Sequence, residues 1–264
     1  MTLFSGVALV TGAASGIGQA TAISFIREGC RKIAIADLNA SGLAETAQRM
    51  RDLVSTSVEV DIVTHTTDIT RESDVEDLLE KTVSAFGRVD YAANCAGVLA
   101  PLQPSHETSA ADFDKTNSIN YRGCWLTSRA EIRQMLKQDP LPTHDGRPGS
   151  RGSIVNIASQ LGIVGRAGAP AYCASKAAVI SLTKCDAIDY SKDNIRVNCV
   201  CPGLIDTPLT HAHLDHLKAA ISIAPMDRPG TAQEVADAVL FLCSSKASFV
   251  QGSALVVDGG YTIN

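Results

Sequence analysis

A glycine-rich turn near the N-terminus is the feature that most restricts the fold of this chain. The apolar run Val7–Val10 leads into Thr11-Gly12-Ala13-Ala14-Ser15-Gly16-Ile17-Gly18, and a helical stretch over Gln19–Glu28 follows. Glycines let the backbone turn tightly and approach a ligand closely. The start of the helix then offers free N–H groups and the positive end of a dipole to a phosphate group. The spacing is Gly-x-x-x-Gly-x-Gly, not the commoner Gly-x-Gly-x-x-Gly. The position of the turn between a strand and a helix is therefore what indicates a dinucleotide-binding site.

The same alternation of strand and helix continues to the end of the chain. We expect strands at Val7–Val10, Lys32–Ala36, Val60–Thr67, Tyr91–Asn94, Ser153–Ala158, Ile195–Cys201 and Ala254–Val257. Helices are expected at Gly16–Glu28, Ser41–Leu53, Glu72–Ala85, Ala110–Lys115, Asn117–Lys137, Ala171–Tyr190 and Ala232–Leu242. This order is typical of an α/β fold with a doubly wound parallel sheet and helices on both faces. No Pro/Gly-rich linker or repeat divides the 264 residues, so we expect one Rossmann-like domain over 1–264.

An acidic residue closes the second expected strand. Asp37 stands nineteen residues after Gly18, the distance at which a carboxylate binds the ribose hydroxyls of an adenosine in dinucleotide-binding folds. A carboxylate there repels a 2′-phosphate, the next residue is Leu38, and the glycine-rich loop contains no basic residue. The pattern predicts NAD rather than NADP. The alternative, that Asp37 caps the helix from Ser41, is compatible with the same spacing.

Several polar or glycine residues follow the ends of expected strands. They are Gly12, Asp37, Asp68, Asn94 and Ser159. Ligands of doubly wound sheets bind at the carboxyl ends of the strands, near the switch in strand order, so these residues should gather around one site. Asp68 is predicted to face the adenine, and its alternative role is to cap the helix after Thr70.

Three residues in the second half of the chain suit proton transfer at a substrate oxygen. Tyr172 and Lys176 are four residues apart, which places them on one face if the segment is helical, and Ser159 lies thirteen residues before the tyrosine. A nearby cation lowers the pKa of a phenol from its usual value of about 10. A serine hydroxyl holds the substrate oxygen while the phenol moves its proton.

Five short motifs together resemble those of the short-chain dehydrogenase/reductase family. They are Thr11-Gly12-x-x-x-Gly16-x-Gly18; Asn94-Cys95-Ala96-Gly97; Asn120 within Ile119-Asn120-Tyr121-Arg122-Gly123; Ser159 with Tyr172 and Lys176; and Pro202-Gly203 with Ile205 and Thr207. The resemblance covers essentially the whole chain. Cys95 departs from the family's second asparagine and Ala158 from a frequent second serine, and we expect little consequence from either.

The resemblance implies a catalytic set and a set of cofactor contacts. The catalytic set is Asn120, Ser159, Tyr172 and Lys176. The implied contacts are Gly12, Ser15, Gly16, Ile17, Gly18, Asp37, Asp68, Ile69, Asn94, Ala96, Gly97, Tyr172, Lys176, Pro202, Ile205 and Thr207. It further implies that Lys176 binds the nicotinamide ribose and that Asn120 holds a water molecule linking Lys176 to solvent. A homotetramer (or homodimer) is implied too, built through the helices that hold Asn120 and Tyr172 and through the C-terminal strand.

Composition excludes other classes of partner. The net charge is −5 without a basic run, so nucleic acid and anionic membranes are not expected partners. No apolar run approaches transmembrane length, and the N-terminus lacks the basic region of a signal peptide. The eight cysteines are scattered, with Cys199 and Cys201 expected on opposite faces of a strand. They form no metal-type or secreted-type pattern, and we expect a cytoplasmic protein with no metal.

Two segments have a less regular pattern. The Pro/Gly-rich stretch 139–152 is expected to be a surface insertion that enters its strand at the amino end, opposite the active site. The stretch 204–228 is expected to be a substrate lid, and its histidines His211, His213 and His216 lack a metal-type spacing. An apolar inner surface is expected from Leu204, Leu209, Leu214, Leu217 and Ile221.

These features predict hydride transfer between NAD and a secondary alcohol or ketone, with Tyr172 as general acid or base. The leucines of the lid favour a bulky apolar substrate. The chain also resembles family members from secondary metabolism, which implies a terpenoid or polyketide alcohol as a possible substrate. Because cytosolic NAD is mostly oxidised, oxidation of the alcohol is the expected direction. Two alternatives remain: an NADPH-dependent ketone reductase, and a cofactor-binding protein without turnover. The complete set of four catalytic residues argues against the second.

Overall fold

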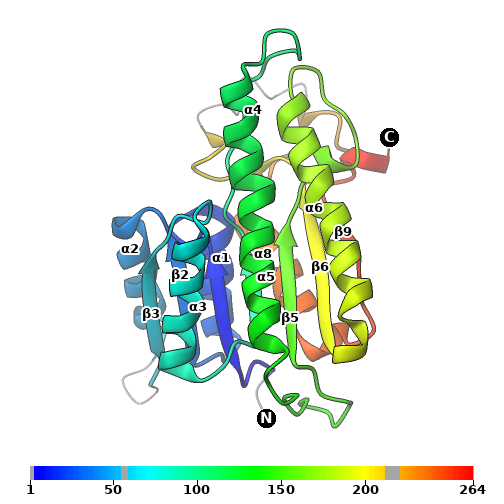
Figure 1. Cartoon of the computed structure of the whole chain (residues 1–264). Helices are drawn as coiled ribbons and strands as arrows, with labels where there is room; N and C mark the ends of the chain where they lie inside the picture. The colour runs from blue at the N-terminus through cyan, green and yellow to red at the C-terminus, as the bar shows by residue number, and fades with distance from the viewer. Residues whose placement is uncertain (1–2, 55–58, 212–220, 264) are drawn as a thin grey trace.

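A seven-stranded parallel sheet forms the centre of the computed structural model, which describes residues 3–54, 59–211 and 221–263. Its strands lie in the order β3 (Asp61–Thr66), β2 (Lys32–Asp37), β1 (Val7–Thr11), β4 (Tyr91–Asn94), β5 (Gly152–Ile157), β6 (Ile195–Pro202) and β9 (Ala254–Val257) (Figure 1). Every pair of neighbours is parallel. The doubly wound α/β fold predicted from the alternation is confirmed, and the order reverses between β1 and β4.

Helices cover both faces of the sheet because the strands alternate their apolar side chains. One buried cluster joins Ala8 and Val10 of β1 to α1 (Gly16–Arg27), α2 (Ala40–Asp52) and α8 (Ala232–Cys243). The other joins Leu9 of the same strand to α3 (Glu72–Phe86), α5 (Cys124–Met135) and α6 (Pro170–Asp189). Strands buried on both faces are the expected form in such a sheet.

One long helix was predicted across Asn117–Lys137, and here the structure differs. Helix α4 (Ala110–Asn117) continues into a π-helical turn over Ser118–Gly123, and only then does α5 begin. A single π-helical turn inside an α-helix is often found at functional sites. Helical periodicity in the sequence does not distinguish the two hydrogen-bond patterns.

A small second sheet fastens the ends of the segment expected to form a lid. Strand β7 (Ile205–Asp206) pairs with β8 (Gly230–Thr231), and neither strand was predicted. Thr231 and Glu234 form a capping box at the start of α8, and Arg228 binds the Glu234 carboxylate at 2.6 Å. Hydrogen bonds from Arg228 and Thr231 lower the pKa of Glu234 to about 2. His213, His216, Leu214 and Leu217 lie outside the described residues.

The cysteines in this structure are all free thiols. Cys199 and Cys201 pack in one buried cluster with Cys124, on the same side of β6. The expectation of opposite faces was wrong, because residues two apart in a strand share a face. Among the described residues, none of the helices has the length and apolar character needed to cross a membrane.

The stretch 139–152 connects α5 to the amino end of β5, as the sequence predicted. In Figure 1 it lies at the bottom of the molecule, whereas the arrowheads of the strands point to the top. An antiparallel bridge between Leu141 and Ser150 closes it into a compact loop.

Candidate active site

The glycine-rich turn after β1 is shaped by three glycines that admit no side chain. Gly12 and Gly16 have φ values of 68° and 54°, in the left-handed region that favours glycine. A Cβ on Gly18 would lie 2.1 Å from the carbonyl oxygen of Gly12, and a Cβ on Gly12 would lie 2.6 Å from the backbone nitrogen of Ala96. The turn therefore packs closely on the loop after β4 and leaves the start of α1 open to a ligand.

Asp37 lies at the end of β2, facing this turn. Its Oδ2 accepts from the backbone N–H of Ala14 at 3.1 Å, and its Oδ1 accepts from that of Asn39 at 2.9 Å. Asn39, rather than Asp37, caps α2 through the N–H of Gly42. The capping alternative for Asp37 is wrong, and its carboxylate is left at the edge of a groove.

That groove, about 330 Å³ in volume, runs along the carboxyl ends of the strands near the switch point. Eleven of the expected cofactor contacts line it: Gly12, Ser15, Gly16, Ile17, Gly18, Asp37, Asp68, Ile69, Ala96, Gly97 and Thr207. Leu209, which was expected on the inner surface of the lid, lines it too, whereas the sequence reasoning missed Leu38, Thr67, Thr70, Cys95, Val98 and Ile119 as lining residues. Most of these directly adjoin predicted residues, so the positions next to each strand end were the available signal. Of the residues that the structure describes around the groove, none is basic.

Asp68 orders the turn before α3 and lines the groove. Its Oδ1 accepts from both the backbone N–H and the hydroxyl of Thr70, at 2.9 and 2.7 Å. The N-cap residue of α3 is Arg71, and no side chain caps that helix, so the capping alternative for Asp68 is wrong. Its role toward an adenine stays a prediction.

Asn94 is placed differently from its neighbours. Its side chain is buried and turned into the protein, where Nδ2 donates to Ser128 Oγ, Glu131 Oε2 and Asn156 Oδ1 at 3.3, 3.0 and 3.1 Å. Burial raises the pKa of the Glu131 carboxyl to about 7. Asn94 therefore ties β4 to β5 and α5, and only the residues after it reach the groove.

Pro202 and Ile205 also lie away from the groove. Both are buried at and after the end of β6, and Ile205 lines a separate small cavity with Gln160 and Leu204. Thr207, by contrast, approaches Gly16: a Cβ there would lie 3.3 Å from the Cβ of Thr207.

Ser159, Tyr172 and Lys176 come together near Gly97, which lines the groove. Lys176 is buried and donates from Nζ to the carbonyl of Ile157 at 2.8 Å, with Nζ 5.9 Å from the centroid of the Tyr172 ring. Ser159 follows β5, and its Oγ accepts from the N–H of Leu161 at 3.1 Å.

The pKa of Tyr172 differs from the sequence-based expectation. Burial raises it above its usual value, while the hydroxyl of Ser159 lowers it in part. Burial also lowers the pKa of Lys176. The expected lowering of the Tyr172 pKa by Lys176 is therefore wrong for this structure, because burial of the phenol has the largest effect.

Asn120 lies in the π-helical turn and faces Lys176 across Gly97. Its Oδ1 accepts from the N–H of Val98 at 2.8 Å, and its Nδ2 donates to the Val98 carbonyl and to Ser175 Oγ at 3.0 and 3.1 Å. A Cβ on Gly97 would lie 3.2 Å from Asn120 Oδ1 and 3.4 Å from Lys176 Nζ. Glycine keeps this space between the two polar groups open.

No group of three His, Cys, Asp or Glu side chains suited to a metal ion occurs among the residues that the structure describes. His211 instead pairs with Asp206, Nδ1 to Oδ1, at 2.9 Å.

Comparison with known proteins agrees with the fold. Residues 12–262 match a family model described as enoyl-(acyl carrier protein) reductase. The chain is 40% identical over 263 residues to a 2-(R)-hydroxypropyl-CoM dehydrogenase of Xanthobacter autotrophicus, covering 98% of this chain and 99% of the relative. It is 38% identical over 267 residues to the short-chain dehydrogenase fogB of Aspergillus ruber, covering 98% and 97%. The crystal structure of a levodione reductase superposes with a TM-score of 0.90 at 31% identity, covering 98% and 99%. The chain belongs to the short-chain dehydrogenase/reductase family, whose members are oxidoreductases that use nicotinamide cofactors.

Proposed function

We propose that this protein is an NAD-dependent dehydrogenase that interconverts a secondary alcohol and its ketone. The observation that carries the proposal is the Asp37 carboxylate at the edge of a groove in which no described lining residue is basic. A 2′-phosphate would meet a negative charge there, with no arginine or lysine among the described lining residues to bind it. The ribose hydroxyls of NAD, in contrast, can donate hydrogen bonds to a carboxylate.

The residues of the groove fit a dinucleotide. Gly12 and Gly18 leave no room for a Cβ, so backbone alone faces the ligand, and α1 begins at Gly16 with its free N–H groups. This is the arrangement that binds a pyrophosphate. Asp37, Asp68 and Ile69 would hold the adenosine half, and Gly97, Lys176 and Thr207 the nicotinamide half. Bound NAD would supply the hydride acceptor, the carbon C4 of its nicotinamide ring.

The protein's own residues move the proton. Ser159 Oγ would hold and polarise the substrate oxygen, and Tyr172 would take the hydroxyl proton in oxidation or return it in reduction. Oxidation requires the phenolate form of Tyr172, and burial disfavours that form. The ammonium group of Lys176, whose Nζ lies 5.9 Å from the centroid of the Tyr172 ring, would stabilise that phenolate.

Leu209 supports an apolar substrate site. It is 48% exposed and borders both the groove and a neighbouring cavity lined by Val98, Leu99 and Pro101. We propose that the segment 204–228 is a lid that closes over this surface, within one domain spanning 1–264. A bulky apolar alcohol, including a terpenoid or polyketide secondary metabolite, is the substrate class that such a surface would take.

A homotetramer, or a homodimer of the same surfaces, fits the large apolar side chains left on the outside. They lie on α4, α5, α6, α8 and β9: Phe113 is 45% exposed and Ile188 78%, and Trp125, Phe241 and Val256 are exposed too. Cytoplasmic location stays a prediction.

The test is turnover on a panel of secondary alcohols and ketones with each of the four nicotinamide cofactors. Reduction of NAD by an alcohol supports the proposal, and selective use of NADPH would favour a ketone reductase instead. Tight NAD binding without turnover on any compound would favour a cofactor-binding protein.

A further inference from the structure

A small cavity of about 90 Å³ lies where the chain leaves β5, β6 and β9, at their carboxyl ends. Ile205 of β7 lines this cavity, and Thr207, two residues further on, lines the cofactor groove. Gln160 lines the cavity too, and it directly follows Ser159, the residue proposed to hold the substrate oxygen. The cavity is therefore next to the proposed reaction site, on the same edge of the sheet.

The side chain of Gln160 is buried without a hydrogen-bond partner. The residue is 7% exposed, and its Oε1 packs against Gly203, where an added Cβ would lie 3.0 Å from it. Oε1 has no partner, and Nε2 donates to no group of the described chain but, unlike Oε1, keeps accessible surface. A buried amide without hydrogen bonds costs free energy. Because Gln160 lines the cavity, a group bound there is the partner that Nε2 can reach.

The charged groups of the same cavity, in contrast, are already paired. Arg228 binds the Glu234 carboxylate at 2.6 Å. The carboxylate of Asp258 accepts from the backbone N–H groups of Gly260 and Thr262, at 2.8 Å each. A charged ligand therefore finds no free counter-charge among the described lining residues, whereas a neutral oxygen can accept a hydrogen bond from Gln160.

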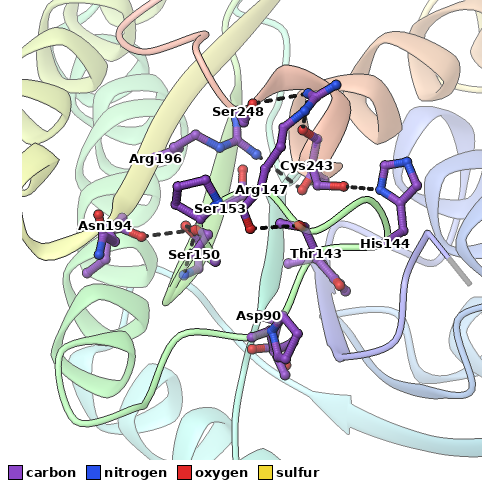
Figure 2. Close-up of a pocket in the computed structure, with 18 of the residues that line it drawn as sticks. Asp90, Thr143, His144, Arg147, Ser150, Ser153, Asn194, Arg196, Cys243 and Ser248 are labelled. Atoms are coloured by element: carbon purple, nitrogen blue, oxygen red, sulfur yellow. Dashed lines mark hydrogen bonds between the residues drawn. The ribbon is translucent and has the colours of Figure 1, made fainter. Parts of the chain in front are cut away.

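A larger cavity of about 520 Å³ lies at the opposite edge of the sheet, where polar side chains hold the protein together (Figure 2). Arg147 Nη1 donates to the carbonyl of Ser245 and to Ser248 Oγ at 3.3 Å each, which fastens the loop 139–152. Arg88 binds Asp90 at 2.7 Å. The amide of Gln160 has no such structural role.

The remaining walls of the small cavity are largely apolar. Leu204, Ile221 and Met226 line it around the amide of Gln160. Such walls suit a carbon skeleton, and a single polar group among them fixes the orientation of a ligand. The combination therefore fits a neutral, mainly apolar molecule that carries one oxygen at this point.

We propose that Gln160 is a specificity-determining residue that donates a hydrogen bond from Nε2 to a second, neutral oxygen of the substrate. The inference rests on the proposed function and narrows its substrate to an apolar secondary alcohol, or its ketone, with one further hydroxyl or carbonyl group. Ser159 would hold the reacting oxygen and Gln160 the second one. Such a site rejects an analogue without the second oxygen, because the amide is then left unpaired.

The experiment compares cyclohexanol with the 1,2-, 1,3- and 1,4-diols of cyclohexane, because the ring fixes the distance between the two oxygens. One measurement is kcat/KM for the reduction of NAD. The other needs no turnover: it is the saturable rise in unfolding temperature when the same compounds are added to the full-length protein with NADH.

Four proteins are compared in both measurements. They are wild type, Gln160→Met, which removes the amide at similar volume, Gln160→Asn, which withdraws the amide by one methylene, and Gln48→Met. Gln48 is the matched control, because its exposed amide on α2 binds only Asp52, at 2.8 Å.

In wild type we expect at least one diol to exceed cyclohexanol by about tenfold in kcat/KM and in apparent affinity, more than its second reactive hydroxyl gives by number alone. The advantage should fall to about twofold or less in both variants of Gln160 and persist in Gln48→Met. The diol that responds identifies the spacing of the two oxygens.

The proposal is overturned if no diol exceeds cyclohexanol in either measurement, or if the variants of Gln160 keep the advantage. Turnover of alcohols without that advantage would reject the role of Gln160 and leave the dehydrogenase standing. A binding advantage that is lost in Gln160→Met, with no turnover of any compound, would support the role of Gln160 and reject the dehydrogenase.

Discussion

Lys176 Nζ lies 5.9 Å from the centre of the Tyr172 ring and is held there by the carbonyl of Ile157. The two residues share one face of α6, as their spacing of four predicts. Yet the pKa of Tyr172 is raised and that of Lys176 lowered, since both are removed from water. In the structure as it stands, burial therefore disfavours the charged form of each residue.

Removal of the Tyr172 hydroxyl should abolish turnover and retain cofactor binding. In Tyr172→Phe we expect kcat to fall by roughly 10²- to 10⁴-fold, the usual contribution of a general acid or base. NAD affinity, measured by fluorescence titration, should change little. Tyr190→Phe is the control, because Tyr190 lies at the C-terminal end of α6 and Tyr172 in its first turn. Wild-type rates in Tyr172→Phe would remove this residue from the mechanism.

Asp37 should set the preference for NAD. Asp37→Ala and Asp37→Asn remove the charge that repels a 2′-phosphate, so the ratio of kcat/KM for NAD over NADP should fall about tenfold or more. The ratio is the informative quantity, because loss of the hydrogen bonds from Ala14 and Asn39 will weaken binding of both cofactors. A ratio that does not change counts against the ribose assignment.

Gly97 should be needed to keep the space between Asn120 and Lys176 open. In Gly97→Ala a methyl group would lie 3.2 Å from Asn120 Oδ1 and 3.4 Å from Lys176 Nζ. We expect kcat to fall by roughly 10²-fold, since a small displacement of catalytic groups costs that much. Gly165→Ala is the matched control, because its Cβ would meet nothing within 4 Å. Equal activity of the two variants would show that the space has no catalytic role.

Glu131 should make stability depend on pH. Its folded-state pKa of about 7 lies above the ordinary carboxyl value of 4.5, because it is fully buried. The folded state therefore holds this proton more tightly, so the contribution of Glu131 to stability is fully present below pH 4.5 and is lost as the pH rises to about 7. The loss is on the order of 3 kcal/mol.

Urea unfolding of wild type and Glu131→Gln over this pH range isolates that effect. The glutamine side chain of the variant cannot ionise, so the difference in free energy of unfolding between the two proteins should change with pH up to about 7. A difference independent of pH would show that burial does not raise the pKa of Glu131 in the folded protein.

The exposed apolar side chains should mark the surfaces between subunits. Ile188→Glu, at the end of α6, should lower the sedimentation mass of the protein, whereas Leu53→Glu on the exposed end of α2 should not. Analytical ultracentrifugation at micromolar concentration measures this. A stable, active wild-type monomer would contradict the proposed assembly.

Local sequence patterns carried the fold and much of the site. The strands at Tyr91–Asn94 and Ala254–Val257 were predicted to the residue. In a chain that alternates strands and helices, a short apolar segment between two helices is typical of a buried strand of a parallel sheet. The residues around Gly12 and Asp37 were found because their backbone geometry and charge are tied to fixed positions after strands.

Features that depend on packing between distant segments were not predictable. The inward turn of Asn94 is decided by Glu131 and Asn156, from two other elements. The raised pKa of Tyr172 depends on how much of the protein surrounds it. The loop 139–152 is held by hydrogen bonds from Arg147 to Ser245 and Ser248, about a hundred residues further along the chain.

The most direct measurement is a binding titration of purified protein with NAD, NADH, NADP and NADPH. Reduced-nicotinamide absorbance is then followed against hydrophobic secondary alcohols and ketones. The geometry around Asp37, Ser159 and Tyr172 predicts NAD-selective binding and reduction of NAD by an alcohol of the panel. Selective binding of NADP would contradict the role given to Asp37, and with it the central claim of an NAD-dependent alcohol dehydrogenase.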